Sequence, residues 1–283
     1  MHEQIKECTT GDGYVLKYRS WQSGQSDTLV VTLHGILTHS GWFHEMADDL
    51  MARGIHTIGH DRRGSGLNDA MRGDAEGPHQ LLDDLQSLVA PHRARYKRIL
   101  YIGWCLGSCV ALHEMLRNDH AGEGLILMSP DIFECHLDEK VRATFSDPKW
   151  DNRTMPRLRP PIPVEIYTKS HYLETFIKPD TLKLKEFTPR FLRASMRLKE
   201  DLELQFARFT KPSMLLLAAR DRIIDNARTR ALYEHIGSAK PEVVELDSDH
   251  GLMFDAKEEL VATVVRFARS LPNHRDATCE AAA

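Results

Sequence analysis

The sequence lacks the features that mark membrane-spanning and nucleic-acid-binding proteins. No run approaches the roughly 20 consecutive apolar residues that cross a bilayer, and residues 1–12 lack the apolar stretch of a signal peptide. The formal net charge is only -4 over 283 residues, which gives no strong reason to expect nucleic acid or a membrane surface as a partner. We therefore expect a cytoplasmic protein without an integral membrane segment.

The cysteines also lack a pairing pattern. The chain has five, in an odd and scattered set without CxxC pairs or the spacing of a disulfide framework: Cys8, Cys105, Cys109, Cys135 and Cys279. Two histidine pairs, His34 with His39 and His56 with His60, are spaced like metal ligands, but a loop and a strand end account for them better. We expect thiols in a reducing compartment, no metal and no cofactor.

What the chain does have is the patterning of an α/β protein. Apolar residues make up 42% and charged residues 28%, as in globular proteins with a large core. Segments near 5–10 and 14–21 alternate in polarity around a Gly-Asp-Gly turn, which favours a hairpin at a sheet edge. Short β-branched runs then alternate with helical stretches, which predicts a mostly parallel central sheet flanked by helices. The expected parallel strands are 29–33, 57–59, 99–102, 125–128, 213–219 and 243–246.

The alternation of strands and helices is interrupted once. It stops near Asp131 and resumes at 213, and the interval is rich in proline at first and then helical in character through 187–209. We expect residues 1–131 and 211–271 to form the core and 132–210 to form a helical cap or lid. The polar residues 272–283 are expected to be a disordered tail.

The strongest chemical signal is a cysteine between a buried strand and a small-residue helix. Residues 103–107 read Gly-Trp-Cys-Leu-Gly, which is a nucleophile elbow with Cys105 in the serine position. The N-terminus of the following helix favours a thiolate at Cys105. The alternative interpretation is a buried structural cysteine beside a tight turn.

A thiolate nucleophile requires a base and an acid that orients it. Among 15 histidines, His250 follows the last expected strand, where the histidine falls in the chain order nucleophile, acid, histidine. Asp221 stands at the carboxyl end of the strand at 213–219 and is the favoured acid. Asp131, after an earlier strand, is a rival, whereas Asp225 is better placed to cap the next helix.

An acyl-transfer site also needs two N–H donors for the oxyanion. One is expected from Leu106, directly after the nucleophile. The second is expected from Ile36, where the strand at 29–33 ends in His34-Gly35 and the chain turns inward. We interpret His34 as structural rather than as a proton carrier.

Five segments connect these residues to a known family. Residues 34–43, HGILTHSGWF, resemble the HGxxxHSxxY/F segment of the monoacylglycerol lipase and lysophospholipase group of α/β-hydrolases, a group similar to serine aminopeptidase-like hydrolases. Residues 59–66 resemble its D-x-R-G-x-G loop, and the elbow, 219–225 and 248–251 follow in order. The resemblance implies an α/β-hydrolase fold with Cys105, Asp221 and His250 as the catalytic triad, and Ile36 and Leu106 as the oxyanion donors.

Cysteine in place of serine is where the chain departs from this family. In that respect it is similar to dienelactone hydrolases, polyhydroxyalkanoate synthases and bile-acid amino-acid acyltransferases. We expect an acyl hydrolase that acts on an ester or thioester through a thioester acyl-enzyme. The substrate would be a small acyl compound, with carrier-bound and coenzyme A thioesters among the candidates. The alternatives are an acyltransferase that uses an amine, alcohol or thiol acceptor, and a non-catalytic binding protein of the same fold.

Overall fold

A computed structural model describes residues 3–132, 156–160, 162–200 and 202–274 of the chain. Its centre is an eight-stranded sheet in the order β1-β2-β4-β3-β5-β6-β7-β8. The first two pairings are antiparallel and all the others are parallel, so the predicted α/β class is confirmed. The strands are β1 Gln4–Thr9, β2 Val15–Trp21, β3 Thr28–Leu33, β4 His56–His60, β5 Arg98–Trp104, β6 Gly124–Met128, β7 Ser213–Ala218 and β8 Pro241–Leu246. The expected tail lies, from residue 275 on, outside the described residues, as do Cys135 and Cys279.

The burial of the strands explains why their sequences differ in pattern. Every residue of β3, β6 and β7 is buried, because helices cover both faces of a parallel sheet. These strands are accordingly near-continuous apolar runs. The β1–β2 hairpin forms one edge, and there the residues of β1 are exposed or half-buried.

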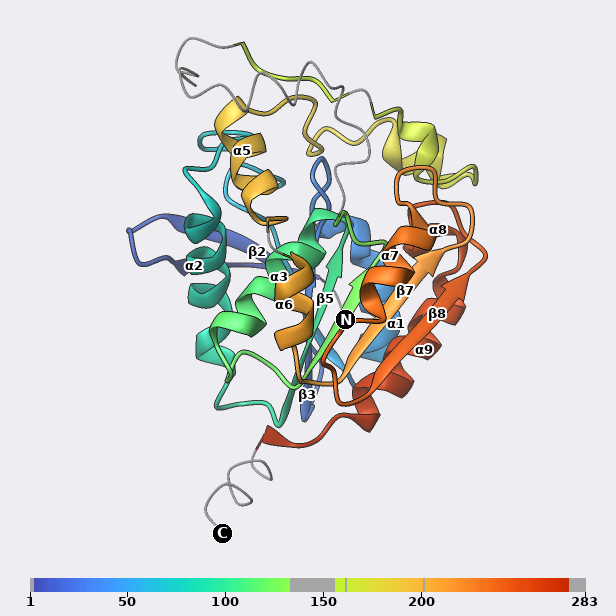
Figure 1. The fold of residues 1–283 in the computed structure, drawn as a ribbon. Helices are drawn as coiled ribbons and strands as arrows, with labels where there is room; N and C mark the ends of the chain where they lie inside the picture. Colours follow the sequence, from blue (N-terminus) through green and yellow to red (C-terminus); the bar gives the residue numbers. More distant parts are fainter. Residues whose placement is uncertain (1–2, 133–155, 161, 201, 275–283) are drawn as a thin grey trace.

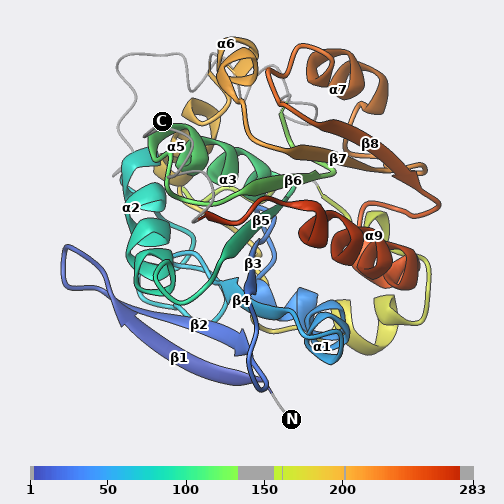
Figure 2. The same ribbon diagram turned by 90° about the horizontal axis from the view of Figure 1, so that it is seen from below.

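Helices cover the two faces of the sheet unequally. Figure 2 shows α1 and α9 together on one face, and α2, α3 and α7 on the other. Apolar side chains of each layer form a separate core cluster against the sheet. The helices of the two layers are α1 His44–Ala52, α2 Pro78–Val89, α3 Leu106–Arg117, α7 Asn226–Tyr233 and α9 Lys257–Ser270.

The described residues between β6 and β7, up to and including α5, lie over the end of the sheet where the parallel strands finish, whereas α6 lies lower, beside α3 (Figure 1). They include two short turns, η3 Val164–Ile166 and η4 Leu173–Ile177, and two helices, α5 Pro189–Arg197 and α6 Leu202–Arg208. Backbone hydrogen bonds tie this segment to loops of the core: Leu184 N–H donates to Leu37 O, and Gly251 N–H donates to Tyr167 O. Helix α6 belongs to the predicted cap but packs beside α7 of the core. The division into core and cap at residue 210 therefore stays a prediction.

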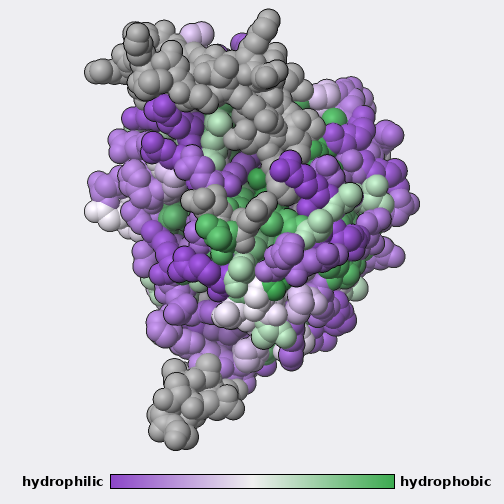
Figure 3. Space-filling view, in the orientation of Figure 1, coloured by the Kyte–Doolittle hydropathy of each residue, from purple (hydrophilic) through white to green (hydrophobic). Residues whose placement is uncertain are grey.

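The outer surface is polar over most of the face that Figure 3 shows. Hydrophobic side chains gather near its centre, over α3 and α6. Among the described residues, Leu204 of α6 is one of the few large apolar side chains that are mainly exposed. Within the described ranges, no helix has the length and apolar character needed to cross a membrane.

The start of α3 approaches β3 so closely that only glycine fits at position 107. A Cβ added to Gly107 would lie 2.3 Å from Leu33 O, whereas a Cβ added to Gly11 would meet nothing within 4 Å. We expect Gly107→Ala to lower the free energy of unfolding by about 1–3 kcal/mol, as overpacking of a closely packed region does. Gly11→Ala is the control and should stay near the native value in urea denaturation. Equal stability of the two variants would contradict this account.

Candidate active site

Cys105 occupies a strained turn between β5 and α3. Its backbone dihedrals are φ 54° and ψ -123°, in a left-handed region that non-glycine residues rarely adopt. Hydrogen bonds fix the turn, since Cys105 N–H donates to Met128 O at 3.0 Å and Ser108 N–H donates to Cys105 O at 3.0 Å. The residue is only 6% exposed. Such strain persists where the surrounding structure imposes it, and it is concentrated at functional sites.

The loops after β7 and β8 bring Asp221 and His250 together. His250 Nδ1 and Asp221 Oδ2 are 2.8 Å apart, and both side chains are fully buried. Asp221 Oδ1 accepts hydrogen bonds from the N–H groups of Ile223 and Ile224 at 2.9 and 3.0 Å. Burial opposes the ionised carboxyl, but the charge and hydrogen bond of His250 and these two N–H groups hold the pKa of Asp221 below its usual value.

The pKa of His250 depends on both Asp221 and Cys105. Burial disfavours the imidazolium, but the charge and hydrogen bond of Asp221, together with the Cys105 thiol, outweigh it and raise the pKa of His250 to about 10. Nε2 is buried and has no partner at ordinary hydrogen-bond geometry among the described residues. Cys105 directly follows Trp104, whose ring packs against that of His250, which agrees with the effect of the thiol on the pKa of His250.

Asp131 and Asp225, the other carboxylates weighed from the sequence, have different partners. Asp131 Oδ2 lies 2.7 Å from Nζ of Lys199 in a mostly buried ion pair. Asp225 accepts a hydrogen bond from Arg228 N–H at 3.0 Å and caps α7, as its sequence position indicates. Of the three, Asp221 is the carboxylate that contacts His250.

Aromatic side chains that the sequence did not single out surround His250. The ring centroids of Trp104 and Tyr167 lie 5.3 and 5.8 Å from that of His250. Trp104 Nε1 donates to His250 O at 3.1 Å, and His250 N–H donates to Ile166 O at 3.3 Å. Trp104 could have been noticed as the residue before Cys105, but no local signal marks Tyr167, which comes from the segment between β6 and β7.

The two other free thiols among the described residues differ from Cys105 in their surroundings. Burial, with a smaller effect from the charge of Asp84, raises the pKa of Cys8 to about 11. Burial in the core raises the pKa of Cys109 to about 12. Both should therefore stay protonated, and thus weakly nucleophilic, near neutral pH.

The loop after β3 lies against Cys105. A Cβ added to Gly35 would be 3.3 Å from Cys105 Cβ and 3.7 Å from Sγ, so Ile36 follows directly on a residue in contact with the cysteine. Leu106 is the first residue of α3, and N–H groups in the first turn of a helix have no partner within the helix. Both residues expected to supply oxyanion donors are therefore close to Cys105. Ile36 follows Gly35, which contacts Cys105, and Leu106 directly follows Cys105 in the sequence.

His34 and Arg62 hold this loop from behind. Arg62 N–H donates to His34 Nε2 at 3.1 Å, so the ring proton belongs on Nδ1, which lies 2.9 Å from Gly35 O. Burial, followed by the charge of Arg62, keeps the pKa of His34 well below its usual value. A neutral His34 fits the structural role expected for it. The role of Arg62 was not anticipated, although it stands in the D-x-R-G-x-G loop.

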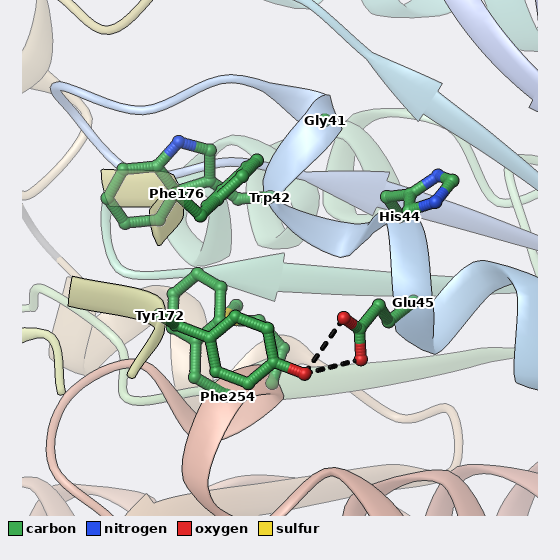
Figure 4. A pocket seen from close by; sticks show the side chains of 8 residues that line it. Gly41, Trp42, His44, Glu45, Tyr172, Phe176 and Phe254 are labelled. Atoms are coloured by element: carbon green, nitrogen blue, oxygen red, sulfur yellow. Dashed lines mark hydrogen bonds between the residues drawn. The ribbon is translucent and has the colours of Figure 1, made fainter. Parts of the chain in front are cut away.

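An open, mainly apolar pocket lies between η1 (Ser40–Phe43), α1, the segment that contains η4, and residues 253–254. Figure 4 shows Trp42 and Phe176 on its wall, and the Tyr172 hydroxyl, which donates to the carboxylate of Glu45. The Trp42 ring packs 4.9 Å from Tyr167, which in turn packs against His250. The pocket is therefore separated from His250 by two aromatic rings and is not the reaction centre. Among the residues described, no group of three or more His, Cys, Asp or Glu side chains is arranged to hold a metal ion.

The chain is similar to several known proteins in sequence and in fold. The chain is 23% identical to an uncharacterized abhydrolase domain-containing protein of Dictyostelium discoideum over 280 residues, which are 95% of this chain but only 29% of that protein. It is 24% identical to human monoglyceride lipase over 245 residues, covering 82% of this chain and 78% of that enzyme. A structure of a soluble variant of monoglyceride lipase from Saccharomyces cerevisiae, in complex with a substrate analogue, superposes with a TM-score of 0.81 at 15% identity and 94% coverage of each chain.

A family model described as serine aminopeptidase, S33, matches residues 24–257. The matched region is most of the chain, and it contains the loop after β3, Cys105, Asp221 and His250. The eight-stranded sheet is the one expected of the α/β-hydrolase fold. The chain therefore belongs to the serine aminopeptidase S33 family of α/β-hydrolases.

Proposed function

We propose that this α/β-hydrolase cleaves acyl esters or thioesters with Cys105 as nucleophile, His250 as proton carrier and Asp221 as the acid that orients His250. The observation that carries the proposal is the strained turn at Cys105, which lies beside a fully buried His250–Asp221 pair. Burying a pair of charged groups costs folding free energy. Ionisable groups with strongly shifted pKa values are concentrated at functional sites. A non-catalytic binding protein would need neither the strain nor the pair.

In the proposed first half-reaction, the proton of Cys105 resides on His250 and the sulfur attacks the substrate carbonyl. The N–H groups of Ile36 and Leu106 stabilise the oxyanion. The bond from the carbonyl carbon to the leaving oxygen or sulfur then breaks, the leaving group takes the proton from His250, and a thioester remains on Cys105.

In the second half-reaction, water attacks the thioester carbonyl and gives a proton to His250. The carbon–sulfur bond breaks, the free acid leaves and Cys105 is restored. An amine, alcohol or thiol in place of water would make the protein an acyltransferase with the same intermediate. A thioester reacts readily with amines and thiols, so transfer is the alternative outcome of the same chemistry.

The substrate class follows from the site and from the relatives. Monoglyceride lipases are among the proteins similar to this chain, which supports a small acyl ester as substrate. Carrier-bound or coenzyme A thioesters belong to the same proposal because a cysteine nucleophile exchanges thioesters directly. A reducing, cytoplasmic compartment suits a reactive thiol of this kind.

The first test is acylation of Cys105 itself. After incubation with a panel of activated esters and thioesters, mass spectrometry of native protein should show an acyl adduct on the peptide that contains Cys105. Cys105→Ala should lose the adduct and lower turnover by roughly a thousandfold or more. Cys105→Ser should acylate more slowly, because its hydroxyl must lose a proton during the attack. Turnover that survives in Cys105→Ala, or no adduct in the native protein, would favour the binding-protein alternative.

The second test separates the two candidate acids. Asp221→Ala should lower kcat/KM by about 10²–10⁴-fold, since His250 loses its orienting partner and its counter-charge. Asp131→Ala is the matched control, because it removes a mostly buried carboxylate from an ion pair with Lys199 and leaves His250 untouched. Both variants are compared in steady-state kinetics at equal folded fraction. A large loss in Asp131→Ala with a near-native Asp221→Ala would reverse the assignment.

The third test concerns the proton on His250. The pKa of His250 is raised from 6.5 to about 10, so its proton stabilises the folded state fully below pH 6.5, and that stabilisation is lost as pH rises through about 10. The free energy of unfolding of native protein should fall across this range more steeply than that of His250→Gln, which cannot titrate. Urea denaturation at several pH values measures both slopes. Parallel slopes would mean that His250 is neutral in the folded protein.

A further inference from the structure

We infer that Arg62 is a positioning residue of the oxyanion hole: its guanidinium holds the carbonyls of the loop after β3 so that the N–H of Ile36 faces Cys105. This inference rests on the proposed function. Arg62 follows β4, next to β3 in the sheet, and its side chain reaches the neighbouring loop.

The contacts of Arg62 are almost entirely to one stretch of backbone. Nη1 donates to His34 O and Gly35 O, each at 2.8 Å, and Nη2 donates to Ile36 O at 2.9 Å. Its own backbone N–H donates to the His34 ring at 3.1 Å. A planar guanidinium with several donors in fixed directions can hold consecutive carbonyls at once, which a lysine ammonium cannot do with the same rigidity.

The geometry of the peptide unit links these carbonyls to the oxyanion donor. The carbonyl of Gly35 and the N–H of Ile36 belong to one planar trans unit and point in opposite directions. Arg62 holds the carbonyl side of this unit. Gly35 also packs against Cys105, with an added Cβ only 3.3 Å from Cys105 Cβ. Fixing the carbonyl on Arg62 thus fixes the N–H of Ile36 away from Arg62, on the side available to the substrate.

The positive charge of Arg62 is buried without a carboxylate partner. Arg62 is 2% exposed, and no carboxylate of the described residues forms an ion pair with it. Burial lowers the pKa of Arg62 to about 9, with Cys105 and Asp61 acting against that decrease. The neighbouring Arg63, by contrast, is paired with Asp84 and Asp12. A buried cation without a carboxylate is costly for folding, and here it stands behind the loop where negative charge develops in the proposed reaction.

The test compares two reactions of the same sulfur. Acylation by an activated ester forms an oxyanion, whereas alkylation by iodoacetamide displaces iodide at a saturated carbon and forms none. Arg62→Met and Arg62→Lys should lower the single-turnover rate of Cys105 acylation by about 10–100-fold, a little less than removal of an oxyanion donor outright. Alkylation of Cys105, followed by peptide mass spectrometry, should stay close to the native rate in Arg62→Lys, which keeps the positive charge near the sulfur, and should fall much less than acylation in Arg62→Met.

Arg63→Lys is the matched control. It makes the same change at the adjacent arginine, whose partners are the carboxylates of Asp84 and Asp12 and not the loop after β3. It should show no selective loss of acylation. Thermal melting establishes that each variant is folded, and if Arg62→Met does not fold, Arg62→Lys decides. Equal losses of acylation and alkylation at Arg62, native acylation in Arg62→Lys, or a selective loss in Arg63→Lys would overturn the inference.

The two proposals fail in different ways. If native protein forms no acyl adduct on Cys105, the proposed function falls and the inference falls with it. If native protein acylates and Arg62→Lys acylates at the native rate, the function stands and the role of Arg62 is wrong.

Discussion

The close approach of two backbone segments, the end of β3 and the start of α3, is the constraint on which the site depends. Gly107 has Leu33 O within 2.3 Å of where its Cβ would be, and Gly103 has the backbone of Ser108 within 2.4 Å. With no side chain at either position, α3 can begin directly above the sheet. The turn that results forces Cys105 into a left-handed conformation and brings its sulfur to the loop that carries Ile36. The same close packing therefore both joins α3 to the sheet and sets the position of Cys105.

Buried charge is the second organising feature. Asp221 with His250, Asp131 with Lys199, and Arg62 all lie at the carboxyl end of the sheet, where they are fully or mostly removed from water. Two of these are pairs whose members compensate each other, whereas Arg62 is offset by carbonyl dipoles and, without a direct ion pair, by the charge of Asp61. An environment of this kind stabilises an anion that forms during a reaction more than it stabilises the resting fold.

The segment between β6 and β7 belongs to the site as much as to the surface. Ile166 and Tyr167 contact His250 through the backbone and through ring packing, and Asp180 accepts hydrogen bonds from Trp42 and lies 3.0 Å from the His39 ring. His39 and Trp42 follow the loop after β3. Any shift of this segment would therefore be felt both at His250 and at the loop after β3.

The sequence by itself determined the mostly parallel sheet and the hairpin at its edge, and it favoured Asp221 over Asp131 as the contact partner of His250. Strand burial leaves a period or a continuous apolar run that can be read locally, and the position of Asp221 after β7 follows from chain order. Asp225 as the cap of α7 is equally local.

Only the tertiary structure decided that Asp131 pairs with Lys199, that the Tyr167 ring packs against His250 and that Arg62 donates hydrogen bonds to the loop after β3. These contacts join residues 68, 83 and 28 positions apart in the chain, as the pairs Asp131–Lys199, Tyr167–His250 and His34–Arg62 show. No local pattern encodes such pairs, because a charge or ring placed near a strand end acquires its partner from whichever loops the fold gathers at that end.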